Sequence, residues 1–261
     1  MRYGLDISPA GPWGDPRTMA GIAALAERSG WDGIFCEDYL VFPGAEPSYD
    51  PWITLTAVAL ATDRVVLGTL VTPLPRRHPA VVASQAMTLD HLSGGRVVLG
   101  VGSGDPDSAE PFVAGEATDA AGRAARLDRA LDDVTGFCEA QPRRRVPIWV
   151  GGALTRRGPR ARALRWEGAC LYRVPPPAWE DIEPDDVRTL REDARELRGD
   201  DDFVVAVGGR ERRDDVAAEL DYVTALRDAG ATWWHEYVPP WVPIEVARER
   251  IAGGPLRARQ P

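Results

Sequence analysis

Hydrophobic residues are concentrated in two short runs, at 65–71 and 97–101, and both runs have the length and the β-branched content of buried strands. Between them, at 80–92, hydrophobic residues recur at three- to five-residue spacing, which is typical of a helix with one buried side. Pro79 can open this helix, and Gly94 can end it in the left-handed conformation that a helix cap uses. The pattern predicts two parallel strands joined by a helix, with ligand-binding loops after the strands.

The same alternation of strand-like and helix-like patterns continues along the whole chain. Further strands are predicted at 3–7, 33–36, 147–150, 169–172, 203–207 and 231–237. Further helices are predicted at 16–29, 50–62, 120–139, 159–166, 185–198, 214–229 and 244–251. Eight strands alternating with eight helices, without a linker or a break in composition, predict one α/β domain over 1–261, folded as a (β/α)8 TIM barrel.

Ligand-binding residues of such a barrel lie at the carboxyl ends of its strands. The residues found at these positions are Asp6, Ser8, 37–39, 70–72, 102–105, 151–155, Arg173 and 235–237. In the last strand, neighbouring side chains point alternately into the barrel and outward. One of Trp234 and His235 therefore lines the interior, and the pattern alone leaves open which one.

The segment 67–104 carries a set of short motifs in a fixed order. They are Leu67-Gly68-Thr69, Leu74-Pro75, His78-Pro79, Thr88-Leu89-Asp90, Leu92-Ser93-Gly94-Gly95-Arg96 and Leu99-Gly100-Val101-Gly102. With these motifs the chain resembles the bacterial-luciferase-like family of flavin- and deazaflavin-dependent oxidoreductases. The resemblance covers about forty residues, which makes it far more specific than a single glycine pair.

This resemblance implies an oxidoreductase or monooxygenase that acts on a small organic substrate, with O2 as a second substrate in the monooxygenase case. It implies reduced FMN as the cofactor, with the 8-hydroxy-5-deazaflavin coenzyme F420 as the alternative. Family members place the cofactor ring over a non-prolyl cis peptide, and the matching positions here are Leu70 and Val71, followed by Thr72. An FMN-dependent enzyme would also need a flavin reductase to supply reduced FMN.

The chain departs from the family after the second strand. The luciferases have Glu-His-His there and the deazaflavin enzymes have an Asp-His pair, whereas this chain has Glu37-Asp38-Tyr39. We therefore expect Asp38 or Tyr39 to act as the general acid or base. A carboxylate at this position could equally cap a loop.

Two glycine-containing segments, Gly102-Ser103 and Gly151-Gly152, follow apolar strands. Glycines there let backbone N–H groups approach an anionic or planar ligand, although glycine pairs also form ordinary turns. Arg156 and Arg157 follow the second segment, with Arg160 and Arg162 close behind them. Guanidinium groups pair well with phosphate oxygens, so we expect the cofactor phosphate at this loop.

The charge and cysteine content of the chain indicate which classes of partner it can bind. With 31 basic and 40 acidic residues the net charge is −9, which disfavours nucleic acid and anionic membranes as partners. The three cysteines are far apart and indicate neither a disulfide framework nor a metal site. The sequence shows no signal peptide and no apolar run of the roughly 18 residues that a membrane span needs. We expect a cytoplasmic protein.

Two features bear on assembly. The predicted helices at 52–61 and 80–92 are mostly apolar or small, which predicts a homodimer. Family members carry insertions after strands four and seven, whereas the loops here are short, so part of the substrate enclosure is missing or comes from a partner subunit. The short loops and the missing histidine also favour an alternative function, a non-catalytic subunit that binds flavin weakly or supports an active partner.

Overall fold

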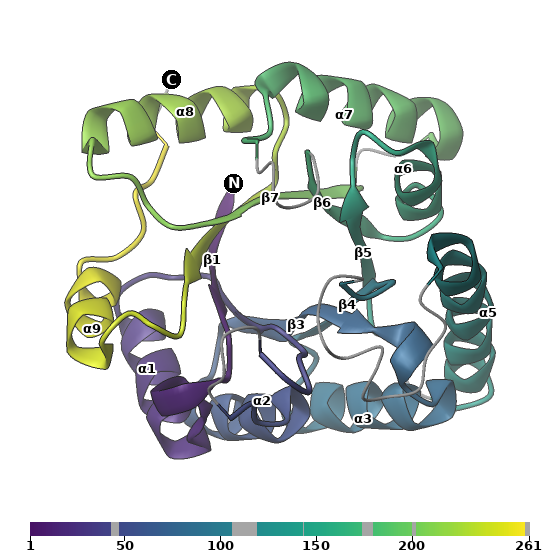
Figure 1. The fold of residues 1–261 in the computed structure, drawn as a ribbon, viewed down its shortest axis with the longest axis horizontal. Helices are drawn as coiled ribbons and strands as arrows, with labels where there is room; N and C mark the ends of the chain where they lie inside the picture. Colours follow the sequence, from purple (N-terminus) through teal and green to yellow (C-terminus); the bar gives the residue numbers. More distant parts are fainter. Residues whose placement is uncertain (43–46, 106–118, 143, 174–179, 200–201, 259–261) are drawn as a thin grey trace.

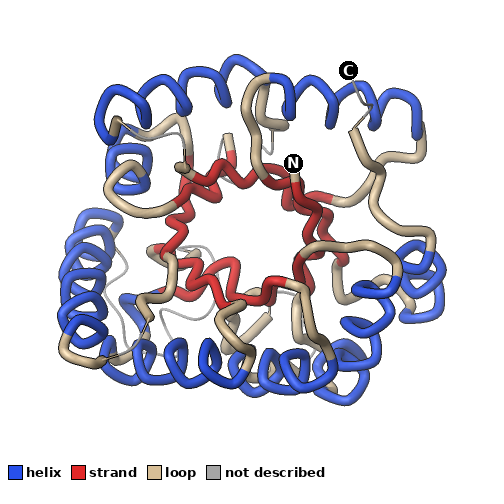
Figure 2. Tube along the Cα trace, turned by 180° about the vertical axis from the view of Figure 1, so that it is seen from behind, coloured by secondary structure: helices blue, strands red, loops and turns tan. Residues whose placement is uncertain are grey.

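The computed structural model describes residues 1–42, 47–105, 119–142, 144–173, 180–199 and 202–258. Eight parallel strands close into a barrel in sequence order, and helices surround it (Figures 1 and 2). The strands are β1 (Arg2–Ile7), β2 (Gly33–Cys36), β3 (Val66–Pro73), β4 (Val97–Gly102), β5 (Ile148–Ala153), β6 (Gly168–Tyr172), β7 (Val204–Arg210) and β8 (Trp233–Val238). The α-helices are α1 (Pro16–Arg28), α2 (Pro51–Ala61), α3 (Pro79–Leu92), α5 (Ala120–Glu139), α6 (Arg157–Ala163), α7 (Pro184–Arg198), α8 (Val216–Asp228) and α9 (Ile244–Ala252). The predicted barrel is confirmed.

Helix boundaries follow the capping residues of the sequence. The Asp15 carboxylate accepts the backbone N–H of Arg17 at the start of α1, and the Asp50 carboxylate accepts two backbone N–H groups at the start of α2. Each of these helices has proline in its first turn, where the missing N–H is not needed. Gly199 follows α7 with φ of 67°, a conformation that favours glycine.

Strand β3 differs in detail from the prediction, because it continues through Pro73 instead of ending near residue 71. Its register against β4 shifts between Thr69 and Thr72, and Pro73 pairs with Gly102 at the very end of the ladder. A proline is tolerated there because the strand ends with it. The Leu70–Val71 peptide bond is cis, as the resemblance implied.

The Leu92-Ser93-Gly94-Gly95-Arg96 motif holds the barrel together between α2 and β3. The Arg96 guanidinium donates hydrogen bonds to the backbone oxygens of Ala59, Thr62 and Val65 at 2.8–3.0 Å. It thereby satisfies carbonyl groups at the end of α2, which have no partner inside the helix. This part of the family motif is structural and lies away from the carboxyl ends of the strands.

The barrel interior is filled by aromatic side chains. Phe35, Trp149 and Trp233 are nearly fully buried, and each pair of their rings has centroids 5.6 Å apart. His235 also points inward, with its ring centroid 4.7 Å from that of Phe35, whereas Trp234 points outward against Tyr222 on α8. The interior is therefore closed below the ends of the strands, and His235 is the inward residue of the pair that the pattern left open.

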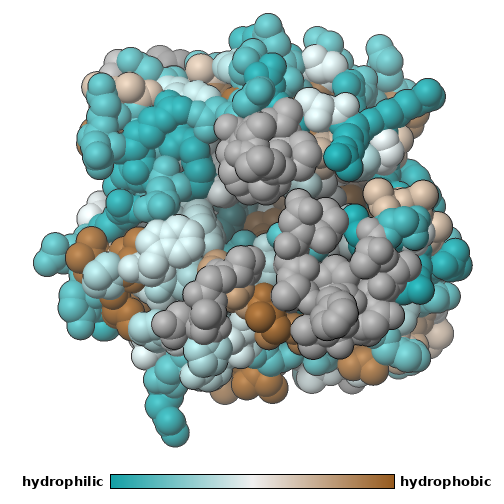
Figure 3. Space-filling model, viewed as in Figure 1, coloured by the Kyte–Doolittle hydropathy of each residue, from teal (hydrophilic) through white to brown (hydrophobic). Residues whose placement is uncertain are grey.

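The face shown in Figure 3 is mostly hydrophilic, with hydrophobic patches at its left edge, near its centre and along its lower edge, where α2 and α3 lie in Figure 1. Four exposed hydrophobic side chains belong to these two helices, Ile53, Leu60, Val81 and Leu92. In the described part of the chain, no helix is both long enough and apolar enough to cross a membrane.

Candidate active site at the carboxyl ends of the strands

Three polar side chains from three strands meet in the mouth of the barrel. The Glu37 carboxylate, just after β2, accepts hydrogen bonds from the hydroxyl groups of Ser8 and Tyr237. The Ser8 and Tyr237 hydroxyl oxygens are 3.0 Å apart, and the Tyr237 oxygen lies 3.2 Å from Glu37 Oε2. Ser8 directly follows β1 and Tyr237 lies on β8, and these two strands pair directly and so bring distant parts of the sequence together at Glu37.

The surroundings of Glu37 raise the pKa of its carboxyl group above the value it has in water. Burial raises the pKa of Glu37 to about 7; the negative charge of Asp6 adds to this effect, and the hydrogen bonds from Ser8 and Tyr237 oppose it. Burial also raises the pKa of the Tyr237 phenol, so that its hydroxyl group stays protonated. A carboxyl group with a pKa near 7 can give up or take a proton at neutral pH, which is the property of a general acid or base.

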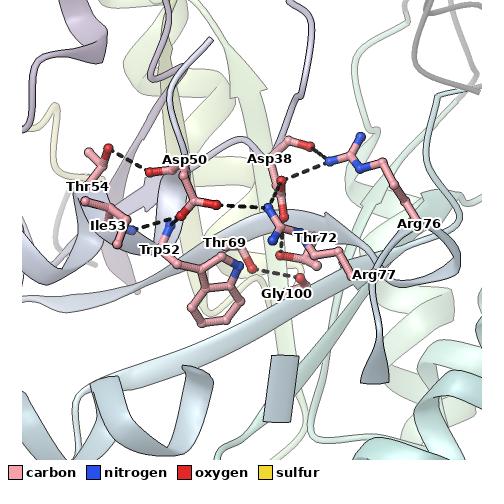
Figure 4. A network of polar contacts seen from close by, with 10 residues as sticks. All are labelled: Asp38, Asp50, Trp52, Ile53, Thr54, Thr69, Thr72, Arg76, Arg77 and Gly100. Atoms are coloured by element: carbon pink, nitrogen blue, oxygen red, sulfur yellow. Dashed lines mark hydrogen bonds and ion pairs between the residues drawn. The ribbon is translucent and has the colours of Figure 1, made fainter. Parts of the chain in front are cut away.

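Asp38 does not join the Glu37 cluster. Its carboxylate binds two arginines and a threonine in a polar network that Figure 4 shows. One carboxylate oxygen accepts from Arg76 and Arg77 at 2.9 and 2.6 Å, and the other accepts from the Thr72 hydroxyl at 2.9 Å. The Asp38 side chain is fully buried, and Arg77 also lies 3.5 Å from Asp50. The network fastens the end of β3 to the end of β2 and to the start of α2.

Tyr39, the other expected acid or base, is half-buried beside Phe42, with ring centroids 5.4 Å apart. It contributes to the electrostatic surroundings of Tyr237. Tyr39, in the loop after β2, therefore lies close to the Glu37 cluster. Thr72, which was expected near the cofactor ring, instead donates a hydrogen bond to Asp38.

The ends of β3, β4 and β5 meet at Val71. A β-carbon on Gly102 would lie 2.7 Å from one Val71 methyl, and one on Gly151 would lie 2.8 Å from the other. Real contacts of this kind are longer, so the valine can lie across these two strands only because both positions are glycine. Leu70, half-buried, packs against the aromatic interior, and Ser103 is half-buried just beyond β4. The structure thus brings together the residues expected around the cofactor ring.

Gly152, the second glycine of β5, packs tightly against Pro159 of α6, where a β-carbon would lie 2.8 Å from the proline ring. Arg156 and Arg157 are exposed at the start of α6, and Arg156 acts electrostatically on the half-buried Tyr172. The other two arginines of this segment bind acidic side chains, Arg160 that of Asp193 and Arg162 that of Asp128. Only the first two arginines of the segment are therefore left to face a ligand in the described structure.

Sequence reasoning included Ser8, Glu37 and Tyr237 among the strand-end residues without giving them a role. A signal for them was present, because Gly4, Asp6 and Ser8 alternate with the apolar residues of β1. Small and polar residues at every second position of a barrel strand indicate the inward face. The segment after β4, where a short loop was expected, lies outside the described residues from position 106 to 118.

The model of one protein family, luciferase-like monooxygenase, matches residues 4–231 of the chain. The chain is 45% identical over 102 residues to an F420-dependent glucose-6-phosphate dehydrogenase of Beutenbergia cavernae, a match that covers 37% of the chain and 30% of that protein. It is 29% identical over 200 residues to the 4-hydroxyprotoasukamycin monooxygenase of Streptomyces nodosus subsp. asukaensis, which covers 67% of the chain and 54% of that protein. These matches span only part of each relative.

Solved structures are similar in fold at low sequence identity. An F420-dependent secondary alcohol dehydrogenase superposes with a TM-score of 0.72 at 16% identity, covering 96% of the chain and 98% of that protein. The F420-dependent tetrahydromethanopterin reductase of Methanopyrus kandleri gives a TM-score of 0.67 at 18% identity, and 97% of each chain is covered. The chain thus has the same barrel fold as those two proteins.

Proposed function

Since the chain belongs to the luciferase-like monooxygenase family, we propose that it is an oxidoreductase that transfers hydride between a deazaflavin coenzyme of the F420 type and a small alcohol or ketone. Several relatives carry F420 in their names, including a dehydrogenase and a putative oxidoreductase. This favours the deazaflavin over FMN, which was the first expectation from the sequence. The chain aligns with only part of these relatives, so the reaction is proposed from the residues of its own site.

The observation that carries the proposal is the Glu37 cluster. Oxidation of an alcohol removes a hydride from carbon and a proton from oxygen, and reduction of a ketone returns both. When bound, the deazaflavin accepts or supplies the hydride. Glu37 takes the hydroxyl proton during oxidation and gives it back during reduction, because its pKa of about 7 suits both directions. Ser8 and Tyr237 hold its carboxyl group in place.

The residues opposite the cluster fit the cofactor. Val71 and the two glycines beneath it offer an apolar, side-chain-poor surface on which a planar ring can lie. Arg156 and Arg157 supply exposed guanidinium groups for a phosphate. Asp38 has an anchoring role in this proposal, since its carboxylate already accepts from two arginines and a threonine. The aromatic interior keeps water from reaching the site through the barrel.

A second candidate is an FMN-dependent monooxygenase, which the alignment with the Streptomyces monooxygenase favours, because it extends over 67% of the chain. In that reaction Glu37 would donate a proton as O2 is reduced and one oxygen atom enters the substrate, the other leaving as water. The two candidates share the ring surface and the phosphate site. They differ in the cofactor that binds and in whether O2 is consumed.

The test is a titration of the purified chain with coenzyme F420 and with FMN, followed by cofactor fluorescence. We expect micromolar affinity for F420 and binding of FMN that is about tenfold weaker or worse. Arg156→Ala should weaken F420 binding by about tenfold, because a charge-assisted contact to phosphate is lost, with little change in turnover at saturating cofactor. Arg160→Ala is the matched control, since Arg160 binds Asp193 instead.

Turnover is then measured from the visible absorbance of the bound deazaflavin with a panel of alcohols and ketones. Reduction by an alcohol, or oxidation by a ketone, supports the proposal. Preferred binding of FMN together with O2 consumption would favour the monooxygenase. Cofactor binding without any electron transfer would favour the non-catalytic subunit, and micromolar binding of neither cofactor would overturn the proposed function.

A further inference from the structure

A second pair of polar side chains lies in the barrel one layer below the Glu37 cluster. Asp6 Oδ1 and His235 Nδ1 are 2.7 Å apart, and their side chains are 12% and 3% exposed. Asp6 precedes Ser8 by two positions on β1, and His235 precedes Tyr237 by two on β8, so each shares the inward face with a member of the cluster. The pair and the cluster are therefore stacked along the same two strands.

The surroundings of His235 are almost entirely aromatic. Its ring centroid lies 4.7 Å from that of Phe35, 5.5 Å from Trp233 and 6.2 Å from Trp149. Its Nε2 atom is buried and has no hydrogen-bond partner in the described structure. On β1, Gly4 leaves room for the imidazole, since a β-carbon there would lie 3.1 Å from it. The three aromatic rings around His235 offer it no polar partner, and the carboxylate of Asp6 accepts the hydrogen bond of its imidazole in the described structure.

We propose that Asp6 and His235 are positioning residues: His235 donates its Nδ1 hydrogen to Asp6 and holds the Asp6 carboxylate one layer below Glu37, on the inward face that β1 and β8 share. This inference rests on the proposed function, in which Glu37 moves the substrate proton. Donation from His235 fixes the position of the Asp6 carboxylate on the inward face of β1. A fixed carboxylate nearby then opposes a second negative charge on Glu37.

The other polar groups around Glu37 do not supply the uncompensated negative charge that Asp6 supplies. Ser8 just after β1 and Tyr237 on β8 donate hydrogen bonds to the Glu37 carboxylate and so favour its charged form, opposite to the effect of Asp6. Asp38 follows Glu37 in the chain, but its charge is balanced by Arg76 and Arg77. Tyr39, in the same loop, acts on Tyr237. Asp6 is the carboxylate whose charge works together with burial to keep the proton on Glu37.

The experiment follows the titration of Glu37 itself in the whole protein, without substrate or cofactor. The carboxyl signals of 13C-labelled glutamate are recorded against pH, and Glu37→Gln identifies the signal of interest. In Asp6→Asn the midpoint of the Glu37 titration should fall by about one pH unit, because a nearby like charge is gone. The matched control is Asp32→Asn, since Asp32 accepts the backbone N–H of Tyr3 at the other end of β1.

Two variants of His235 separate positioning from packing. His235→Asn keeps a donor near the Nδ1 position and should leave the Glu37 midpoint at the wild-type value. His235→Leu fills space without a donor and leaves the Asp6 carboxylate without its partner, so the Glu37 midpoint should move away from the wild-type value. A folded Asp6→Asn protein with the wild-type midpoint would overturn the proposal, and so would equal midpoints in His235→Asn and His235→Leu.

The turnover of Glu37→Gln and the titration of Glu37 distinguish failure of the proposed function from failure of this inference. If Glu37→Gln turns over normally, the role of Glu37 in the reaction is wrong, while a shifted midpoint in Asp6→Asn still supports the positioning pair. If Glu37→Gln is inactive and the midpoint does not move, the function stands and the positioning pair is overturned.

Discussion

Glu37 and Asp38 are neighbours in the sequence but have opposite surroundings. Glu37 lies on the inward face with two hydroxyl groups, and Asp38 lies among two arginines and a threonine. Successive side chains at a strand end point to opposite sides, so a shift of one position changes the chemistry completely. A carboxyl group near hydroxyl groups can exchange a proton, whereas one between two guanidinium groups serves as an anchor.

Exchange of each carboxyl for an amide should separate these roles. Glu37→Gln should lower turnover by about 10²-fold or more, the usual contribution of a positioned acid or base, and leave cofactor affinity nearly intact. Asp38→Asn should instead lower the free energy of unfolding by about 3 kcal/mol, because the buried Arg76 loses its charged partner. Steady-state kinetics and denaturant unfolding measure the two effects. Normal turnover in Glu37→Gln with lost turnover in folded Asp38→Asn would return the acid–base role to Asp38.

The raised pKa of Glu37 also makes stability depend on pH. Between about pH 4.5 and 7 the folded state holds a proton on Glu37 that the unfolded state has lost, so this group's contribution to stability falls as pH rises. The difference in free energy of unfolding, wild type minus Glu37→Gln, should therefore decrease from pH 5 to about pH 8. Denaturant unfolding in a series of buffers measures it. A difference that rises with pH would mean that Glu37 is stabilised as a carboxylate.

Sequence reasoning pointed to the strand ends where the structure places the Glu37 and Asp38 side chains, but it could not choose between neighbouring residues. The partners of Asp38 lie 38 and 39 positions away, and those of Glu37 lie 29 and 200 positions away. A local pattern carries no information about contacts at such separations. The missing histidine directed attention to Asp38, whereas the polar alternation along β1 pointed to the strand face that surrounds Glu37.

At the scale of the elements, two motif glycines allow β3 and β4 to approach closely. A β-carbon on Gly68 would lie 2.0 Å from the backbone oxygen of Val98, and one on Gly100 would lie 2.1 Å from that of Thr69. Both obstacles are backbone atoms of the neighbouring strand, which cannot turn away as the tip of a side chain can. The Leu-Gly pairs of the family motif therefore set the geometry that brings Val71 over the site.

Gly68→Ala should lower the free energy of unfolding by about 3 kcal/mol, because the new methyl group must push β4 aside. Gly136→Ala provides the contrast. Gly136 is exposed within α5 with nothing within 4 Å of the added carbon, so this exchange should raise stability by about 0.5 to 1 kcal/mol. Thermal or denaturant unfolding measures both. Equal effects of the two exchanges would contradict the close approach of the strands.

The order and type of the elements could be predicted because the sequence marks them locally. Asp15 and Asp50 precede prolines at helix starts, and Gly94 and Gly199 follow helix ends. The extension of β3 through Pro73 could not be predicted, since it depends on pairing with Gly102 on β4. Local capping residues fix where a helix ends, whereas the end of a strand depends on its neighbour.

At the scale of the whole molecule, α2 and α3 present hydrophobic side chains to solvent. Ile53 and Leu60 on α2 are 64% and 72% exposed, and Val81 on α3 is 53% exposed. These two helices are neighbours on the outside of the barrel (Figure 1). Several exposed apolar side chains on neighbouring helices are typical of an interaction surface, and we propose a second copy of the chain as the partner.

Light scattering at micromolar concentration should give the mass of a dimer. Leu60→Glu should shift the protein toward the monomer, because a charge would be buried without a partner at the interface. Leu197→Glu is the matched control, since Leu197 is 70% exposed on α7, away from these two helices. A monomeric wild type, or equal dissociation by both variants, would contradict the interface.

The pairing of β1 with β8 affects how the chain folds during its synthesis. Ser8 and Glu37 are made early by the ribosome, and His235 and Tyr237 arrive about 200 residues later. A nascent chain that stops before β8 therefore has two open sheet edges and lacks His235 and Tyr237, the partners of Asp6 and Glu37. Joining ends so far apart is the slow, entropically costly step of such a topology. The hydrogen bond from Tyr237 to Glu37 forms only when the last strand docks, so the Glu37 cluster is completed together with closure of the barrel.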